Sequence, residues 1–306
     1  MTVTAPKTRE EWLKALDELP SSPEKIPAFY FAHSSPLMEM DIPDLPMGKN
    51  GALSHFLGDF GKVLVEKYKP KAIVVFSAHW DTDGTRLVTD YGDENPLYYD
   101  YYGFPGEFFE IKFKSHGDLN LANRIVDLYK KAGSIARTTT VSEHRGVDGL
   151  GKRSSGIDHG VFIPFRRMFG WEIDIPIVEV SIDSSYDPEE EWKIGQVLDE
   201  LRSEGILLLS GGLSIHNLSD RTCFNETKAA DIYKQFDRAV TQAVQVRDPQ
   251  ERKKVMFDLV NHKGFRASHP TAEHFVPIYV AGGAGGNGDT KVLAAIHGAL
   301  TVAFGL

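Results

Sequence analysis

The chain contains 306 residues, of which 42% are hydrophobic and 25% are charged, a composition that is typical of a globular protein. Its formal net charge of -9 argues against a nucleic-acid partner, because proteins that bind the phosphate backbone usually carry a basic face. No apolar stretch approaches the roughly 18 residues needed to cross a bilayer, so we expect no membrane partner.

The N-terminal segment is predicted to be a short helix. Its residues, MTVTAPKTREEWLKALDEL, lack the basic start and apolar core of a signal peptide. Thr8 and Glu11 instead have the spacing of a capping box. Cys223 is the only cysteine, which excludes an intrachain disulfide and a cysteine-based zinc site and favours a cytoplasmic location. We therefore expect an N-terminal helical extension, residues 1–26, and one domain, residues 27–306.

Two buried strands are predicted in the first part of this domain. The apolar run PAFYFA ends at His33, and the run AIVVFSA ends at His79. A helix is expected between them, over residues 54–69. The next segment, residues 90–113, is rich in tyrosine and phenylalanine and is predicted to be a loop. A helix near residues 118–132 and a short strand, ARTTTV, follow it.

The alternation of strands and helices continues in the second half. A glycine-rich stretch delivers His159 just before the apolar run VFIPFRRMF. A strand, IPIVEVSI, precedes a charged helix over residues 188–202, and the strand GILLLSG ends near His216. Amphipathic helices are expected over residues 226–260. A helix that starts at Pro270 and a C-terminal strand, KVLAAI, complete the chain.

This pattern of short apolar runs between helical segments predicts an α/β fold. We expect a single domain with a central, mostly parallel or mixed sheet and helices on both faces. In such sheets ligands bind at the carboxyl ends of the strands. His33, His79 and His216 all follow predicted strands, so the sequence predicts that they meet at one edge of the sheet.

Histidines gathered in this way are typical of a metal centre. Imidazole is the commonest protein ligand for metals, and it also exchanges a proton near neutral pH. The segment HPTAEHF offers two ways to complete the centre. Glu273 could complete a set of two histidines and one carboxylate, as in non-haem iron sites, and it shares a helix face with His269. Alternatively, His274 is the third imidazole and Glu273 orients a neighbouring side chain.

The motifs taken together resemble a known family. The matching pieces are FAHSSP, FSAHW, YDYYGFPGEFFEIKF, GIDHGVFIPFRRMF, PIVEVSID, SGGLSIHNL and HPTAEHFVPIYVAGGAGG, in that order over residues 27–286. The chain resembles the LigB-type (class III) extradiol ring-cleavage dioxygenases, in particular the branch that is similar to DOPA 4,5-dioxygenase. Ser34 stands where the family usually has glycine.

The resemblance implies a metal held by His33, His79 and His274, with His216 as the catalytic acid and base and His159 beside it. It leaves Glu273 and His269 as supporting residues or alternative ligands. The implied cofactor is Fe(II), and the implied substrates are a small aromatic diol and O₂. With Zn(II) in the site, the tetrahedral preference of that ion would make His216 a fourth ligand.

Two other functions fit the same histidines. A zinc hydrolase acting on a small amide or ester would use a metal-bound hydroxide at this site. A non-catalytic relative that binds a metal would keep the fold without the reaction, because a fold does not determine a function. The four cationic side chains Arg145, Lys152, Arg153 and Arg166 are expected to be solvated at the surface, with pairing to a substrate carboxylate as the alternative.

Overall fold

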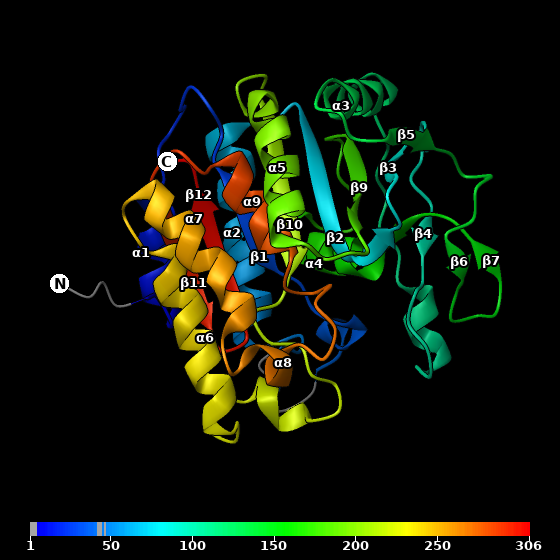
Figure 1. Cartoon of the computed structure of the whole chain (residues 1–306). Helices are drawn as coiled ribbons and strands as arrows, with labels where there is room; N and C mark the ends of the chain where they lie inside the picture. The colour runs from blue at the N-terminus through cyan, green and yellow to red at the C-terminus, as the bar shows by residue number, and fades with distance from the viewer. Residues whose placement is uncertain (1–4, 42–44, 46) are drawn as a thin grey trace.

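The computed structural model describes residues 5–41, 45 and 47–306. Its centre is a mixed sheet of eight strands, shown in Figure 1. In spatial order these are β11 (Thr290–Ile296), β12 (Ala299–Phe304), β1 (Ala28–Ala32), β10 (Ile206–Gly212), β2 (Ala72–Thr82), β9 (Ile177–Asp183), β3 (Arg86–Thr89) and β5 (Ala136–Thr139). The predicted single α/β domain with a mixed sheet is confirmed.

The four central strands explain why the histidines meet. Strands β1, β10, β2 and β9 run parallel, and β1, β10 and β2 are neighbours, so their carboxyl ends lie side by side. The outer pairs β1–β12, β12–β11 and β9–β3 are antiparallel, whereas β3–β5 is parallel. The carboxyl ends of three adjacent parallel strands therefore form one edge at which a site can be built.

Helices cover both faces of the sheet. Trp12, Leu16 and Phe60 belong to a buried cluster on one face, where α1 (Arg9–Asp17), α2 (Ala52–Tyr68) and α4 (His159–Phe169) pack. The other face carries α3 (Leu119–Lys131), α5 (Pro188–Leu198), α6 (Asp231–Val244), α7 (Pro249–Asp258) and α9 (Pro277–Ala284). Figure 1 shows α5 and α9 in front of the sheet, with α2 and α4 behind it.

Shorter elements complete the fold. Two small two-stranded sheets pair β4 (Leu97–Tyr98) with β8 (Ile157–Asp158), and β6 (Gly146–Val147) with β7 (Arg153–Ser154). The remaining turns of helix are α8 (Phe265–Ser268) and the 3₁₀ segments η1 (Pro36–Glu39), η2 (Gly106–Glu110), η3 (Asp199–Arg202), η4 (Arg221–Phe224) and η5 (Leu259–Asn261).

The predicted N-terminal helix is confirmed as α1, and its capping box between Thr8 and Glu11 is present. The helix is not isolated from the domain, because Trp12 and Leu16 are buried in the same cluster as α2. Trp12 also donates a hydrogen bond from Nε1 to Asp59 on α2, at 3.0 Å. Among the described helices, none has the length and hydropathy needed to span a membrane.

The helices expected over residues 226–260 are confirmed as α6 and α7, whereas two other local features differ from the predictions. The helix expected from Pro270 begins at Pro277, and Glu273 and His274 lie in the turn before it. Strand β12 was not predicted, although Gly298 adopts the positive φ of 74° that a tight hairpin turn requires.

Candidate metal centre

Three imidazoles meet at the edge where the parallel strands end. His33 directly follows β1, His79 lies near the end of β2, and His274 lies in the turn before α9. One ring nitrogen from each lies within 4.8 Å of the others. The Nε2 atoms of His79 and His274 are 3.0 Å apart. Three nitrogen donors at this spacing suit a single metal ion.

The turn that carries His274 is fixed by the backbone of β10. The amide of Leu213 donates a hydrogen bond to the carbonyl of His274, at 2.8 Å. A Cβ atom at Gly212 would lie only 2.4 Å from the same carbonyl. Glycine is therefore required at the end of β10, because any side chain would push the turn and its imidazole away from the other two rings.

The surroundings of His33 and His274 keep these rings neutral. Both nitrogens of His33 are buried and have no hydrogen-bond partner in the described structure. Burial, with the neighbouring imidazoles, lowers the pKa of His33 and of His274 well below the ordinary value. A buried imidazole without a partner is costly, and a metal ion would satisfy it. The residues present therefore fit a metal ion.

Asp100 supports His79 and was not singled out in the sequence. Its Oδ2 accepts a hydrogen bond from Nδ1 of His79, at 2.8 Å. Burial alone would lower the pKa of His79, but the contact with Asp100 outweighs it and raises that pKa. The signal in the sequence was a lone carboxylate between two pairs of tyrosines, in YYDYY.

His216 lies beside the three imidazoles. Its ring stacks on that of His274, with centroids 3.5 Å apart and planes at 11°. Its backbone amide donates to the carbonyl of Ser268, at 2.8 Å, which anchors the loop after β10. Burial, with His79 and His159, lowers the pKa of His216 to about 4. The ring is therefore neutral at neutral pH and can accept a proton.

His159 lies against His79. It is the first residue of α4, and its ring centroid is 4.1 Å from that of His79. Its Nδ1 lies 2.8 Å from Oδ1 of Asp100. The structure thus brings both histidines expected to be catalytic to the three imidazoles, His216 against His274 and His159 against His79.

The residues of HPTAEHF divide into two groups. Oε1 of Glu273 accepts a hydrogen bond from Nδ1 of His274, at 2.9 Å, and lies 3.9 Å from Nδ1 of His216. His269 is buried, and its Nε2 lies 3.0 Å from the carbonyl of Ser214. It therefore contacts the loop that leads to His216 and is not one of the three grouped imidazoles.

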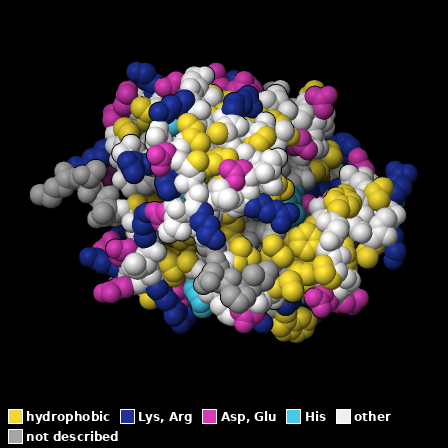
Figure 2. Space-filling view, turned by 90° about the horizontal axis from the view of Figure 1, so that it is seen from below, with side chains coloured by type: hydrophobic (Ala, Val, Ile, Leu, Met, Phe, Trp, Pro, Cys, Tyr) yellow, Lys and Arg dark blue, Asp and Glu magenta, His cyan; other side chains and the backbone are white. Residues whose placement is uncertain are grey.

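A cavity of about 370 Å³ opens beside the imidazoles. Its lining is aromatic and charged, and it consists of Ala78, His79, Trp80, Asp81, Tyr98, Asp100, Arg145, Glu273 and His274. Figure 2 shows hydrophobic side chains gathered at the right of the face seen from below, on the side of β4, β6 and β7. Tyr102, Val147 and Leu150 are exposed in these segments. The cavity is large enough for a small aromatic ring.

The expectation that Arg145 is a solvated surface residue was wrong. Its side chain is 4% exposed and lies between two fully buried carboxylates, Asp158 at 2.7 Å and Glu179 at 2.9 Å. The guanidinium also lies 4.4 Å from the ring centroid of Trp80. Both of its acidic partners are internal, so Arg145 holds the loop before β6 against α4 and β9.

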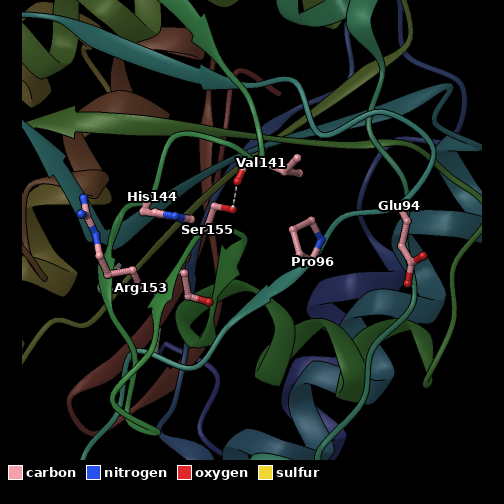
Figure 3. A pocket seen from close by; sticks show the side chains of 7 residues that line it. Glu94, Pro96, Val141, His144, Arg153 and Ser155 are labelled. Carbon is pink, nitrogen blue, oxygen red and sulfur yellow. Dashed lines mark hydrogen bonds between the residues drawn. The ribbon is translucent and has the colours of Figure 1, made fainter.

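A second pocket lies away from the imidazoles, around the β6–β7 hairpin. Figure 3 shows its lining, in which the Ser155 hydroxyl donates to the carbonyl of Val141, at 2.7 Å. His144 and Arg153 lie on one side of it and Glu94 on the other. None of the histidines expected at the metal site lines this pocket.

The fold and the site together define an α/β protein with a cluster of imidazoles suited to a metal ion. The family model described as the catalytic LigB subunit of aromatic ring-opening dioxygenase matches residues 27–303. The chain therefore belongs to the LigB family, and the resemblance seen in the motifs is confirmed. The family description and the names of its curated relatives are those of dioxygenases, which are oxidoreductases.

Named relatives place the chain more closely within the family. It is 40% identical over 304 residues to a 4,5-DOPA dioxygenase extradiol-like protein of Schizosaccharomyces pombe, with 97% of each chain covered. It is 33% identical to the 4,5-DOPA dioxygenase extradiol of Beta vulgaris, covering 87% of this chain and 89% of that one. A solved structure of an uncharacterized Escherichia coli protein matches with a TM-score of 0.65 and 25% identity, covering 92% of this chain and all of that one.

Proposed function

We propose that the protein is a non-haem iron dioxygenase that inserts both atoms of O₂ into a catechol and cleaves the ring beside the diol. The observation that supports this proposal most directly is the meeting of three imidazoles, one of which, His33, has no partner for either ring nitrogen among the described residues. The reaction is expected to take place in the cytoplasm, on a small aromatic diol.

His33, His79 and His274 would hold the metal. Ferrous iron, when bound by three protein ligands, supplies positions for both catechol oxygens and for O₂, and it lets electron density pass from the ring to oxygen. The carboxylate of Glu273 would support His274 through its 2.9 Å contact with Nδ1, rather than act as a ligand itself. His269 would support the loop of His216 through the carbonyl of Ser214.

His216 would act as the base and then as the acid. Its lowered pKa leaves the ring neutral at neutral pH, so it can accept a proton from a catechol hydroxyl. Its contact with His274 places it next to the metal ligands, where that hydroxyl would bind. The imidazole of His216 would return a proton to the product when the catechol ring opens.

His159 would stabilise negative charge as it develops on oxygen. Its ring lies against His79 and is fixed by Asp100 at Nδ1, which leaves Nε2 free to contact a bound substrate. The aromatic side chains that line the cavity, Trp80 and Tyr98, would help to contact the substrate ring.

The identity of the bound metal is expected to depend on the preparation. Sites rich in nitrogen bind Zn(II) more tightly than Fe(II), so protein purified without added iron is expected to carry zinc and to be inactive. With zinc, His216 would be recruited as a fourth ligand, because this ion prefers four tetrahedral ligands. Its ring, which already stacks on His274, would have a short distance to move.

The test is oxygen consumption by the reconstituted protein. The metal-free protein is loaded anaerobically with Fe(II), mixed with a panel of catechols, and followed for O₂ uptake and for a new yellow product. The names of the relatives make 3,4-dihydroxyphenylalanine the first member of the panel. The absence of O₂ uptake with every catechol, together with metal-dependent cleavage of an ester or amide, would contradict the proposal and favour the hydrolase.

A further inference from the structure

One carboxylate contacts two histidines of the site at the same time. We propose that Asp100 is a positioning residue that fixes the rings of His79 and His159 relative to each other, so that a metal ligand and a substrate-facing histidine are set by one side chain. The proposal rests on the proposed function for the roles of the two histidines.

The contacts use both oxygens of the carboxylate. Oδ2 lies 2.8 Å from Nδ1 of His79, and Oδ1 lies 2.8 Å from Nδ1 of His159. Oδ1 also accepts a hydrogen bond from the backbone amide of His159, at 2.9 Å. The Asp100 side chain is only 11% exposed, so water competes little for these three bonds.

The backbone brings Asp100 and His159 together through a short parallel pairing. In this pairing Leu97 lies opposite Ile157, and Tyr98 lies opposite Asp158. The amide of Asp100 donates to the carbonyl of Tyr98, at 3.0 Å, which turns the chain back toward the start of α4. The amide of His159, at the first position of that helix, has no partner within the helix and meets the carboxylate instead.

The two bonds to the imidazole rings determine which ring nitrogens carry hydrogen. A carboxylate only accepts hydrogen bonds, so Nδ1 of each ring must be the donor. In a neutral ring this leaves Nε2 as the free lone pair. For His79 that atom faces His274, 3.0 Å away, which is the direction a metal ligand needs. Asp100 therefore sets both the orientation and the tautomer of the ligand.

The nearby carboxylate of Asp158 cannot take over this role. Its Oδ1 accepts from the Ser77 hydroxyl at 2.7 Å and from the amide of Gly160 at 2.8 Å, and its Oδ2 is paired with Arg145. Among the described side chains, no other carboxylate contacts both rings. Loss of Asp100 would therefore leave both Nδ1 atoms without an anionic partner.

The test compares Asp100→Asn with Asp100→Glu and with a control, Asp93→Asn. An amide has one accepting oxygen, so the asparagine can serve only one of the two rings. Glutamate keeps the carboxylate on a longer stem. Asp93 is exposed on the same segment, and its substitution removes the same charge. Two readouts need no catalysis: Co(II) and Zn(II) affinity by chelator competition, and the histidine tautomers by long-range ¹H–¹⁵N correlation of ¹⁵N-histidine-labelled metal-free protein.

For Asp100→Asn we expect metal affinity about 10- to 100-fold weaker, with the Co(II) spectrum still that of a site with three imidazoles. At least one ring, that of His79 or of His159, should change its tautomer. With saturating Fe(II), kcat should fall tenfold or more while KM for the catechol changes little. Asp100→Glu should recover part of the affinity, and Asp93→Asn should match the wild type.

Unchanged metal affinity and unchanged tautomers in Asp100→Asn would overturn the proposal. So would the loss of an oxygen ligand from the Co(II) site in this variant, because Asp100 would then be a ligand itself. If Asp100→Asn does not fold, the tautomers of Asp100→Glu decide, and a loss of the Nδ1–H form there supports the positioning role. If the wild type turns over no catechol, the proposed function fails, whereas affinity and tautomers still test Asp100.

Discussion

The imidazole of His216 lies flat on that of His274, with ring centroids 3.5 Å apart. One ring is expected to bind the metal and the other to move protons. Because of this stacking, His216, the expected proton acceptor, is held in place by His274, the expected metal ligand. The stacking also lets a single substitution separate the two roles.

Replacing His216 with alanine should abolish turnover and leave metal binding intact. General acid–base catalysis usually contributes between 10²- and 10⁴-fold, so we expect kcat to fall by about that factor. The measurement is O₂ uptake by Fe(II)-loaded protein, with Co(II) affinity measured in parallel. His144→Ala is the matched control, because His144 is exposed beside the second pocket. Turnover that survives in His216→Ala would remove the role of this residue.

Metal should stabilise the wild type and fail to stabilise His33→Ala. Within the described part of the chain both ring nitrogens of His33 lack a hydrogen-bond partner, so metal binding is their expected use. A metal at 100 times its Kd adds about 2.7 kcal/mol to the free energy of unfolding. Urea unfolding of chelator-treated protein, with and without Zn(II), measures this gain. His55→Ala, which changes an exposed histidine on α2, should keep it. An equal gain in His33→Ala would show that the metal binds elsewhere.

The metal-free protein should lose stability as the pH falls from 7 to 5. Burial lowers the pKa of His269 to about 3, so the folded state binds fewer protons than the unfolded state in this range. The free energy of unfolding therefore falls with pH, and this histidine alone accounts for about 2 kcal/mol between pH 7 and 5. In His269→Gln, whose amide can still donate to the carbonyl of Ser214, the free energy of unfolding should fall by about 2 kcal/mol less between pH 7 and 5. A pH dependence identical to that of the wild type would contradict the buried, neutral state of His269.

Replacing Arg145 with methionine should destabilise the protein strongly. The substitution leaves Asp158 and Glu179 buried without their cation, and breaking a buried pair in this way costs about 3–5 kcal/mol. Burial opposes the ionisation of Asp158, yet Arg145 outweighs it and lowers the pKa of that carboxyl. Urea unfolding measures the loss, and Arg153→Met, on the exposed hairpin strand β7, should change stability by less than about 0.5 kcal/mol. Equal stability of the two variants would mean that the buried network contributes little.

The sequence predicted the centre of the fold better than its borders. The apolar runs ending near His33 and His79 are long and uninterrupted, and they became β1 and β2 in the middle of the sheet. Strand β3 has four residues and β12 belongs to a hairpin at the edge, so neither stands out by periodicity. The start of the last helix was predicted wrongly, because Pro270 and Pro277 are equally good helix starts and only packing distinguishes them.

The site was predictable as far as the strands determine it. His33 and His79 follow from the rule that ligands gather where parallel strands end. The choice between Glu273 and His274 did not follow from helix geometry, because neither residue is on a helix. Asp100 was missed for a physical reason: its function depends on a pairing between β4 and β8, strands of two residues each that are about 60 residues apart in the chain.

The place of β12 in the sheet has a consequence for how the protein is made. This strand pairs with β1, so that Ala28 lies opposite Phe304, and His33 follows β1 by a single residue. During synthesis on the ribosome, β12 is completed almost 280 residues after the start of β1. The edge of β1 that pairs with β12 is therefore uncovered until then. His274 also arrives late. Metal capture is therefore expected only after His274 has been synthesised, and truncation within β12 should expose β1 as an aggregation-prone edge.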